Sequence, residues 1–403
     1  MITRQALIAG GGIGGLAAAI ACAHAGWKVR LFEQASAFAE VGAGIQLGPN
    51  ATRLLQAWGL GDALAQVAAF PEALAVRSAP DGRELGRLRL GSRCVARYGA
   101  PYATVHRGDL HALLLQGAAG SGSVQLKLDA HIAGYTETET GVLVAGPEGQ
   151  SVEADALIAA DGLWSGIRRQ ALASSGKGVA GPALATGHLA YRALVRQADI
   201  SPALRSQHVT AWLGPRLHVV SYPVRGGEWL NVVVILQGEP PGDVQNWDQA
   251  ALAADVQAGL SGSCRALQQL VHAVPEWRLW ALCDRPPLQG PDGMAQGRVA
   301  LLGDAAHPMR PYMAQGAGMA LEDAAELGRC LAVVAHRAID VPLALRRYAL
   351  NRWQRNARVQ ARSQRNGRIF HATGPLRWGR DLGLKLLGER LLDVPWLYRG
   401  QGV

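Results

Sequence analysis

Five glycines interrupt an apolar run near the N-terminus, and this interruption constrains the fold more than any other feature of the sequence. The run covers residues 6–25, and its hydropathy alone would suggest a signal peptide or a membrane helix. The glycines fall within residues 10–15, and a glycine inside a helix costs about 1 kcal/mol relative to alanine. The segment therefore predicts a strand, a tight turn and a helix, and no other run is long enough to span a membrane.

The interrupted run matches a dinucleotide-binding fingerprint. Gly10, Gly12 and Gly15 fit the pattern GxGxxG, and Glu33 follows 18 residues after the last of them. In this pattern the glycines let backbone N–H groups approach a pyrophosphate at a helix N-terminus, while the acid accepts hydrogen bonds from ribose hydroxyls. Because the flanking signals agree, we expect a dinucleotide site. The flanking strand, helix and second strand are predicted at residues 5–9, 16–25 and 28–32.

A glycine-rich stretch follows the second strand. It covers residues 40–48 and leads into a helix predicted at residues 51–60, for which Asn50 is the expected N-cap. A nicotinamide dehydrogenase would continue at this point with more regular alternation of strands and helices. The stretch therefore favours a different class of dinucleotide-binding protein.

Two acidic residues each follow an apolar strand. Asp161 stands after a strand predicted at residues 156–159, and Asp304 stands after one predicted at residues 298–302. Ligands of parallel sheets collect at the carboxyl ends of the strands, so both residues are candidate ligand contacts. A carboxylate at Asp304 suits a polyhydroxylated chain, although this residue taken alone could be an ordinary helix cap.

Two glycines open the last long apolar helix. Gly316 and Gly318 precede a helix predicted at residues 319–334. The positive N-terminus of such a helix can stabilise negative charge on a bound ligand. Taken alone, the two glycines could equally belong to a plain loop.

Between these motifs the chain becomes rich in β-forming residues. The longest runs lie at residues 183–198 and 207–237, and two glycines at residues 226–227 predict a hairpin turn within the second run. Residues 73–90 add a strand pair around a Pro-Asp-Gly turn at residues 80–82. These patterns predict a mostly antiparallel sheet inserted into the nucleotide-binding domain.

Length and cysteine content limit the class of protein. With 403 residues the chain exceeds the roughly 250 to 300 residues at which a single core stops growing, so two domains are expected. Its five cysteines are odd in number, scattered, and never spaced as CxxC. We therefore expect neither a disulfide framework nor a metal site, and a reducing cytoplasm suits the chain.

Positive charge is concentrated in one segment, which holds eight arginines and no acidic residue in 23 positions and nearly equals the net charge of +9. A nucleic-acid groove would draw cations from several elements interleaved with aromatic side chains, so no nucleic-acid partner is expected. We interpret the segment as a solvated helix face, with an interface or an anion-attracting surface as the alternative. These residues, called the arginine stripe, are Arg346, Arg347, Arg352, Arg355, Arg358, Arg362, Arg365 and Arg368.

The motifs stand in the order and spacing of a known family. From Gly10 to about Tyr398 the sequence resembles the single-component FAD-dependent aromatic hydroxylases, typified by para-hydroxybenzoate hydroxylase. The resemblance implies tight, noncovalent FAD, and it implies NAD(P)H as a transient co-substrate because the chain has one GxGxxG motif. The implied FAD contacts are Gly10, Gly12, Ile13, Gly14, Gly15, Glu33, Gln34, Gly44, Ile45, Arg107, Asp161, Gly162, Gly303, Asp304, Gly316, Ala317 and Gly318.

The reaction implied by this resemblance is a monooxygenation. NAD(P)H reduces FAD, O2 then gives a flavin C4a-hydroperoxide, and one oxygen atom passes to a small phenolic or hydroxylated heteroaromatic acid. A flavin-dependent oxidase or a quinone-precursor hydroxylase is kept as the alternative, and a basic nucleic-acid or membrane-surface binder as a remote one. The resemblance implies no metal and no membrane insertion, and a homodimer is compatible with it.

The expected substrate pocket departs from each similar enzyme. Similarity is strongest to the hydroxylases of 3-hydroxybenzoate, salicylate and 6-hydroxynicotinate. Gln46 and Tyr312 each stand where the 6-hydroxynicotinate enzymes have histidine, and Pro311 replaces a glutamine of the 3-hydroxybenzoate enzymes. The sequence therefore leaves the identity of the aromatic ring open.

His218 and Tyr222 form the candidate catalytic pair. They lie four residues apart on a strand predicted at residues 217–224, so both side chains point to one face. Burial without partners would cost each group on the order of 1 to 3 kcal/mol, so each should bond to the other, to backbone or to a ligand. Related hydroxylases place such a pair against the substrate hydroxyl, which implies that His218 accepts or relays the phenolic proton while Tyr222 holds the ring. A histidine satisfied within the core beside an anchored tyrosine is the alternative.

The expected fold is α/β, with a Rossmann-like FAD-binding domain, an inserted, mostly antiparallel β-sheet domain that binds the substrate, and a C-terminal helical segment. The FAD-binding domain is discontinuous and is expected at residues 1–72, 100–178 and 285–340. The substrate domain is expected at residues 73–99 and 179–284, and the helical segment at residues 341–403.

Overall fold

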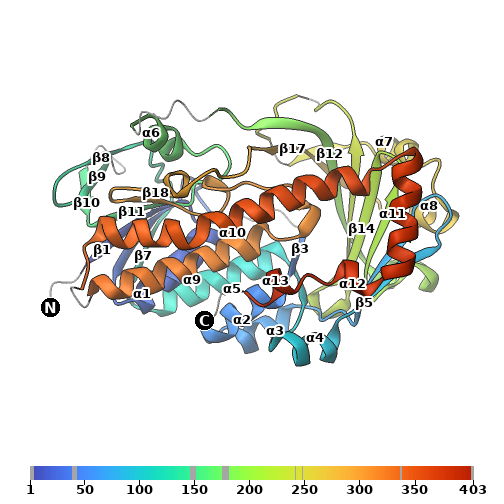
Figure 1. The fold of residues 1–403 in the computed structure, drawn as a ribbon, viewed down its shortest axis with the longest axis horizontal. Coiled ribbons are helices and arrows are strands. Elements are labelled where there is room, and N and C mark those ends of the chain that lie inside the picture. Colours follow the sequence, from blue (N-terminus) through green and yellow to red (C-terminus); the bar gives the residue numbers. More distant parts are fainter. Residues whose placement is uncertain are drawn as a thin grey trace.

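A computed structural model describes most of the chain, and its described residues form two large sheets connected by long helices (Figure 1). The glycine-rich stretch predicted at residues 40–48 lies partly outside them. The described residues are 4–38, 43–145, 151–174, 181–240, 242–246, 248–335 and 338–400.

The predicted strand, turn and helix at the N-terminus are confirmed. Gly10 has a φ of +100°, and a Cβ atom there would lie 2.4 Å from the carbonyl oxygen of Ala160, so only glycine fits this turn. The helix begins at Ile13, three residues earlier than predicted, because Gly12 is already an extended N-cap. The elements are β1 (Gln5–Ala9), α1 (Ile13–His24) and β2 (Lys28–Phe32).

The first large sheet is the expected Rossmann-like sheet. Its six strands follow the order β18-β19-β11-β1-β2-β7, and its pairs are parallel apart from the edge pair β18 and β19. Helix α1 packs against both α5 (Arg107–Gly120) and α9 (Gly316–Ala335). The other strands are β7 (Val124–Lys127), β11 (Ala156–Ala159), β18 (Ala295–Gln296) and β19 (Val299–Leu301).

A small antiparallel sheet and one short helix lie beside the first large sheet. The small sheet has the strand order β10-β9-β8, and the helix follows β11 in the chain. These elements are β8 (Tyr135–Glu137), β9 (Val142–Ala145), β10 (Ser151–Ala154) and α6 (Gly166–Ser174).

The second large sheet has eight strands in the order β16-β17-β12-β15-β14-β13-β4-β5, and only the β13–β4 pair is parallel. The predicted hairpin is confirmed, since β14 and β15 pair across a turn at Arg225–Gly227. Helices α7 (Ala253–Gly259) and α8 (Arg265–His272) add apolar residues to one core of this sheet. The strands are β4 (Ala73–Ser78), β5 (Glu84–Arg89), β12 (Leu184–Arg196), β13 (Val209–Gly214), β14 (Leu217–Val224), β15 (Trp229–Gln237), β16 (Gln249–Ala251) and β17 (Trp277–Asp284).

A two-stranded sheet and three helices complete the N-terminal half. The predicted cap at Asn50 is wrong, because the helix begins at Pro49 with Gly48 as N-cap, and the Asn50 amide instead donates to Gln315 and Glu322. Proline suits the first helical turn because it lacks an N–H that would need a partner there. The elements are β3 (Gly44–Leu47), β6 (Ala103–His106), α2 (Pro49–Ala57), α3 (Gly61–Val67) and α4 (Gly91–Tyr98).

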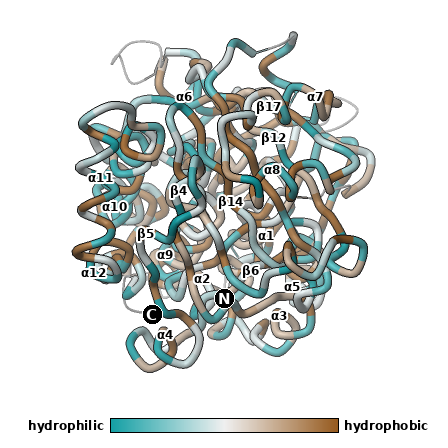
Figure 2. Tube along the Cα trace, turned by 90° about the vertical axis from the view of Figure 1, so that its right-hand side faces the viewer, coloured by the Kyte–Doolittle hydropathy of each residue, from teal (hydrophilic) through white to brown (hydrophobic). Residues whose placement is uncertain are grey.

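The C-terminal segment is helical, and its first helix is the longest in the described part of the chain. Helix α10 packs against α9 and continues toward the large sheet that holds β14 (Figure 1). Helices α11 and α12 lie at one edge of the molecule in Figure 2. Several of their apolar side chains are exposed, namely Leu376, Trp378, Leu382 and Leu386 of α11 and Leu391 of α12. The helices are α10 (Val341–Phe370), α11 (Gly374–Leu387), α12 (Glu389–Leu392) and α13 (Pro395–Tyr398).

The arginine stripe lies on α10, and its interpretation as a solvated face is wrong for part of it. Arg352 is 0% exposed and forms ion pairs with Glu322 and Asp323. Arg355 bonds to Glu322 and to two backbone carbonyls near the C-terminus. The cause is geometric, since the charged face of α10 turns toward acidic residues of α9. Within the described ranges, no helix combines the length and the apolar character needed to cross a membrane.

Candidate cofactor and substrate site

The glycine turn and Glu33 form one end of the candidate site. The two carboxylate oxygens of Glu33 accept hydrogen bonds from the N–H of Gly11 at 2.7 Å and of Ala35 at 2.9 Å. Helix α1 has no side-chain cap, and a Cβ atom on Gly12 would meet nothing within 4 Å. The N-terminus of α1 is therefore open for an anionic group.

The Asp161 and Asp304 motifs lie next to each other. The Arg168 guanidinium, on α6 behind Asp161, donates to the carbonyl oxygens of Ala305 at 3.2 Å and Ala306 at 2.9 Å. Burial raises the pKa of Asp161, although hydrogen bonds from Ser165 and the backbone oppose this effect. The Oδ1 atom of Asp161 is buried and has no partner among the described residues, so it is available to a ligand.

Asp304 lies in a crowded recess that is still open to solvent. Its side chain is exposed, yet the surrounding protein atoms desolvate it and raise its pKa, against the opposing effect of His307 and Arg107. His307 is itself bonded to Asp323, a fully buried residue of α9. The recess is thus supported from behind by ionic contacts, while the Asp304 carboxylate faces the open side.

Two side chains of the second large sheet form hydrogen bonds with Gly44 at the start of β3. The Gly44 N–H donates to Oδ1 of Asn231 at 2.6 Å, and the Tyr222 hydroxyl donates to the Gly44 carbonyl at 2.6 Å. A Cβ atom at Gly44 would lie 2.6 Å from the Tyr222 ring and 2.8 Å from Asn231. The hydroxyl proton of Tyr222 is therefore used by the backbone, and its oxygen retains capacity to accept a bond from a ligand.

Gln46 lies beside the same tyrosine. Its Oε1 accepts a hydrogen bond from the hydroxyl of Tyr102 at 2.7 Å. Burial raises the pKa of Tyr222, and the Gln46 side chain opposes this by hydrogen bonding to it. The predicted pocket residue Gln46 and the predicted catalytic residue Tyr222 are thus direct neighbours.

His218 belongs to a cluster of three histidines and one tyrosine. Its Nδ1 lies 2.7 Å from Nε2 of His371, and the hydroxyl of Tyr312 lies 2.6 Å from Nδ1 of His188. The His218 ring centroid lies 5.2 Å from that of Tyr312 and 5.0 Å from that of His371. We call these four residues the histidine cluster.

Burial keeps the imidazoles of the histidine cluster neutral. It lowers the pKa of His371 to about 3 and the pKa of His218 well below the ordinary value, and neighbouring histidines add to both effects. The pKa of His188 is also lowered by burial and by Arg310, with Asp284 opposing. The three rings are therefore neutral, and protonating any of them in this environment costs more than protonating a free imidazole unless a negative charge lies beside it.

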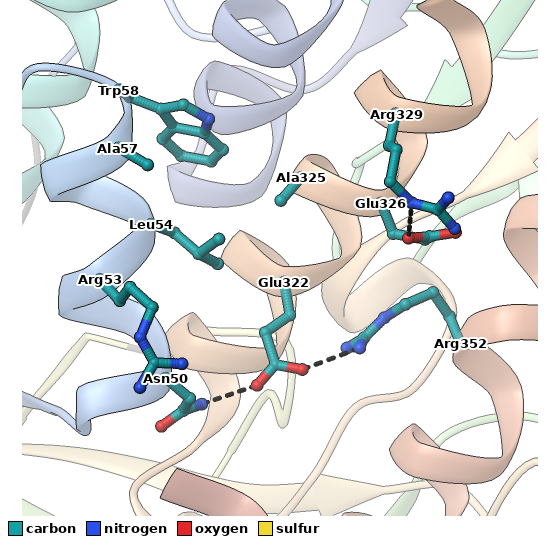
Figure 3. Close-up of a pocket in the computed structure, with 10 residues that line it drawn as sticks. All are labelled: Asn50, Arg53, Leu54, Ala57, Trp58, Glu322, Ala325, Glu326, Arg329 and Arg352. Atoms are coloured by element: carbon teal, nitrogen blue, oxygen red, sulfur yellow. Dashed lines mark hydrogen bonds and ion pairs between the residues drawn. The ribbon is translucent and has the colours of Figure 1, made fainter. Parts of the chain in front are cut away.

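A separate cavity of about 210 Å³ lies between α2, α9 and α10 (Figure 3). Glu322 lies at its centre, between the Asn50 amide at 2.8 Å and the Arg352 guanidinium at 2.8 Å. Asp323 joins this network through Arg352 and His307. Asn50 also bonds to Gln315, directly before the Gly316 turn, so the network supports the candidate site from outside.

The structure therefore brings the predicted residues of the three motifs to one side of the molecule, and it places His218 and Tyr222 on one face of β14. Pro311 and Tyr312 precede α9, where a Cβ atom at Gly316 would meet nothing within 4 Å. The motif patterns did not point to Arg168, His188, Asn231 or His371. A weak signal existed for Arg168, which lies in the Asp161 segment, and none existed for the others.

The donor set fits an extended dinucleotide. Open space at Gly12 and Gly316, the unpartnered oxygen of Asp161 and the exposed carboxylate of Asp304 occur where a pyrophosphate, a ribityl chain and a flavin ring need room or partners. Among the described residues no group of histidines, cysteines and acids could hold a metal ion.

Comparisons with known proteins agree with this donor set. Residues 3–363 match the family described as FAD binding domain. The chain is 39% identical over 395 residues to 3-hydroxybenzoate 6-hydroxylase of Polaromonas naphthalenivorans (strain CJ2), covering 97% of this chain and 95% of that protein. It is 36% identical over 364 residues to 6-hydroxynicotinate 3-monooxygenase of Bordetella bronchiseptica (strain ATCC BAA-588 / NCTC 13252 / RB50), covering 89% and 90%.

A solved structure has the same fold. HpxO of Klebsiella pneumoniae, complexed with FAD and uric acid, superposes with a TM-score of 0.83 at 26% identity, over 96% of this chain and 94% of that one. FAD is thus the dinucleotide that this family of proteins binds.

Proposed function

The chain belongs to the FAD binding domain family and is a flavoprotein aromatic hydroxylase, and from this premise we propose that it uses NAD(P)H and O2 to hydroxylate a small phenolic or hydroxylated heteroaromatic acid. The two relatives support this substrate class, since one is named for 3-hydroxybenzoate and the other for 6-hydroxynicotinate. A single GxGxxG motif supports a nicotinamide that binds only transiently.

The motif residues would hold FAD along the edge of the parallel sheet. Glu33 would accept from the adenosine ribose, the N-terminus of α1 would bind the pyrophosphate, and Asp304 would bind the ribityl chain. Arg107, which already interacts with Asp304, would lie near the phosphates. Gly44 and Ile45 of β3, with the Gly316 turn, would border the flavin ring.

The second large sheet, which contains β14, would hold the aromatic acid. We assign His218 as the group that accepts the phenolic proton, because its imidazole is buried, neutral and on the face of β14 that also carries Tyr222. Tyr222 would position the ring through its oxygen, since its proton is bonded to Gly44. Gln46, Pro311 and Tyr312 would shape the pocket around the ring.

When bound, FAD supplies hydride acceptance and oxygen activation. The protein supplies three other functions: it orients the ring, keeps water out, and removes the phenolic proton so that the ring carbon becomes more nucleophilic. The observation that carries the proposal is the hydrogen bond from the Tyr222 hydroxyl to the Gly44 carbonyl, because it joins the second large sheet to the strand that would border the flavin.

A substrate panel tests this proposal. The purified holoenzyme is supplied with NADH or NADPH and with 3-hydroxybenzoate, salicylate or 6-hydroxynicotinate, and benzoate is the control that lacks a hydroxyl. We expect at least one hydroxylated acid to accelerate NAD(P)H oxidation and to gain one atom of oxygen-18 from labelled O2. Release of peroxide with no hydroxylated product from any acid would contradict the proposal and favour a flavin oxidase.

We further propose that the protein is a cytoplasmic homodimer. Five free cysteines support a reducing compartment, and the exposed apolar side chains of α11 and α12 supply a surface that a second copy could cover. Cell fractionation and sedimentation equilibrium measure these two points, and a monomer at micromolar concentration would contradict the second.

A further inference from the structure

His371 stands directly behind the proposed base. Its Nε2 lies 2.7 Å from Nδ1 of His218. His218 is 2% exposed and His371 is 6% exposed, so both residues are buried. Because Nδ1 of His218 is engaged, Nε2 is the ring atom left to face a substrate. His371 therefore contacts His218 on the side of the ring that faces away from the proposed substrate position.

The fold fixes His371 in this position from two elements. The residue ends α10, where its N–H donates to the Gly367 carbonyl at 3.2 Å, and its own carbonyl accepts from the N–H of Arg216 at 3.2 Å. Arg216 lies directly before β14, the strand that carries His218. The backbones on both sides of the pair are thus joined, so the distance between the two rings is set by the fold.

The pair has two hydrogen-bonding arrangements, and they have opposite chemical consequences. In one, the Nδ1–H of His218 donates to Nε2 of His371, and Nε2 of His218 is a bare acceptor. In the other, the Nε2–H of His371 donates to Nδ1 of His218, which puts the His218 proton on Nε2 and prevents this atom from accepting another. Only the first arrangement provides a base.

When only the burial of polar groups is considered, the first arrangement is less favourable than the second. It leaves the proton of neutral His371 on Nδ1, which is buried and has no hydrogen-bond partner among the described residues. Unpartnered buried N–H groups are rarer in proteins than unpartnered acceptors, so packing alone would select the second arrangement. The tautomer therefore distinguishes a catalytic role from a structural one.

We propose that His371 is a positioning residue that holds His218 with Nδ1 protonated and Nε2 bare toward the substrate hydroxyl, an inference that rests on the proposed function. In the proton transfer the phenolic O–H bond breaks and an Nε2–H bond forms on His218. The substrate becomes a phenolate, the His218 ring becomes an imidazolium, and His371 keeps accepting the Nδ1–H bond throughout. The phenolate beside it then balances the new positive charge.

Burial is the main reason that the rings of the histidine cluster are neutral, and nearby arginines add to it at His371 and His188. Arg380 of α11 interacts unfavourably with a protonated His371, and Arg310 does the same with a protonated His188. Asp284 of β17 is the acidic group that opposes this, and it acts on His188 and is paired with Arg310. The resting pair is therefore neutral, and a proton moves to His218 only where a negative charge beside it, such as that of the phenolate formed, offsets the cost of the buried imidazolium.

Nitrogen-15 NMR of ring-labelled histidine in the FAD-loaded protein tests the tautomer directly, and His218→Gln identifies the His218 signals. We expect a protonated Nδ1 and a bare Nε2 on His218, with or without 3-hydroxybenzoate. A protonated Nε2 with a bare Nδ1 in the wild-type protein would overturn the proposal. This readout does not require turnover, so failure of the substrate panel and failure of the tautomer are separate results.

Kinetics with the most active acid of the panel give the second readout. Loss of a group that orients a metal-ligating histidine typically costs about 10- to 100-fold, and by analogy His371→Leu should lower kcat by about that factor. KM for the acid and the FAD dissociation constant should stay within about twofold, because His371 touches neither in this proposal. His371→Gln, whose amide oxygen can accept the Nδ1–H, should recover most of the rate.

A matched control separates this effect from general damage. His272 lies on α8, is exposed, and bonds only locally to Gln268. His272→Leu should leave kcat and the His218 signals unchanged. Unchanged kcat in His371→Leu would overturn the proposal, and so would equal losses of kcat in the Leu and Gln variants.

Discussion

Gly44 connects two parts of the molecule, because the absence of a side chain lets Asn231 and Tyr222 reach its backbone. Asn231 binds its N–H and Tyr222 binds its carbonyl, each at 2.6 Å, and both side chains come from the large sheet. The strand that would border the flavin is therefore positioned by the sheet that would hold the substrate. Only a glycine lets the two side chains approach the backbone so closely.

We expect Gly44→Ala to weaken both stability and FAD binding. The new Cβ would lie 2.6 Å from the Tyr222 ring, and such overpacking typically costs about 1 to 3 kcal/mol. Chemical denaturation measures the free energy of unfolding, and quenching of flavin fluorescence measures FAD affinity. The control is Gly120→Ala at the end of α5, where a Cβ atom meets nothing within 4 Å. Equal behaviour of the two variants would refute the role of Gly44.

Some functional residues could be predicted from sequence because their signals are local. Asp304 directly follows an apolar strand, and Gly10 belongs to a short pattern with fixed spacing. Asn231 and His371 gave no such signal, because their partners lie 187 and 153 residues away along the chain. Only the register of β14 and β15 and the length of α10 bring those pairs together, and neither quantity is encoded in a motif.

Helix α10 connects the ionic support of the cofactor site to the histidine cluster. Near its middle, Arg352 contacts Glu322 and Asp323, and at its end His371 reaches His218. Burial alone would raise the pKa of Asp323, but His307 and Arg352 hold it well below the ordinary value. The sequence predicted the helix and its charge, but charge spacing alone could not show which arginines would turn inward.

We expect Arg352→Met to destabilise the protein strongly. Removing one partner of a buried ion pair typically costs about 3 to 5 kcal/mol, because the remaining carboxylates lose their counter-charge. Arg368→Met is the control, since Arg368 is an exposed residue of the same helix and exposed substitutions usually change stability by about 0.5 kcal/mol or less. Urea denaturation of both variants gives the comparison. If Arg352→Met unfolds at the same urea concentration as the control, the network contributes no stability.

At the scale of the whole molecule, the FAD unit and the second large sheet meet through buried polar groups, among them Asn231 and Tyr222 at Gly44. Across this boundary His371, at the end of α10, contacts His218 of β14, while Asp323 lies within the FAD unit, and all three have a pKa below the ordinary value. The sequence predicted two units because each has its own strand pattern. It could not predict this contact, since polar residues that pair across two sheets leave no periodic signal in either.

The stability of the protein should therefore fall in mild acid. A lowered pKa means that the unfolded chain binds protons that the native state does not, so unfolding is favoured as pH falls below the unfolded pKa. For histidine that value is about 6.5, which predicts a loss of about 1 kcal/mol per pH unit for each buried ring below it. Asp323 should add a further loss below about pH 4, the ordinary range for aspartate. Thermal unfolding of the FAD-loaded protein between pH 7.5 and 5.5 measures the first step.

His371→Gln separates the histidine contribution from the general effect of acid. The glutamine does not titrate in this range, so the variant should lose less stability between pH 7.5 and 5.5 than the wild type does, by about 1 kcal/mol. His272→Gln changes an exposed histidine and should keep the wild-type slope. A slope that is unaltered in His371→Gln would mean that the native protein protonates His371 as readily as the unfolded chain. The neutral histidine cluster would then have to be abandoned.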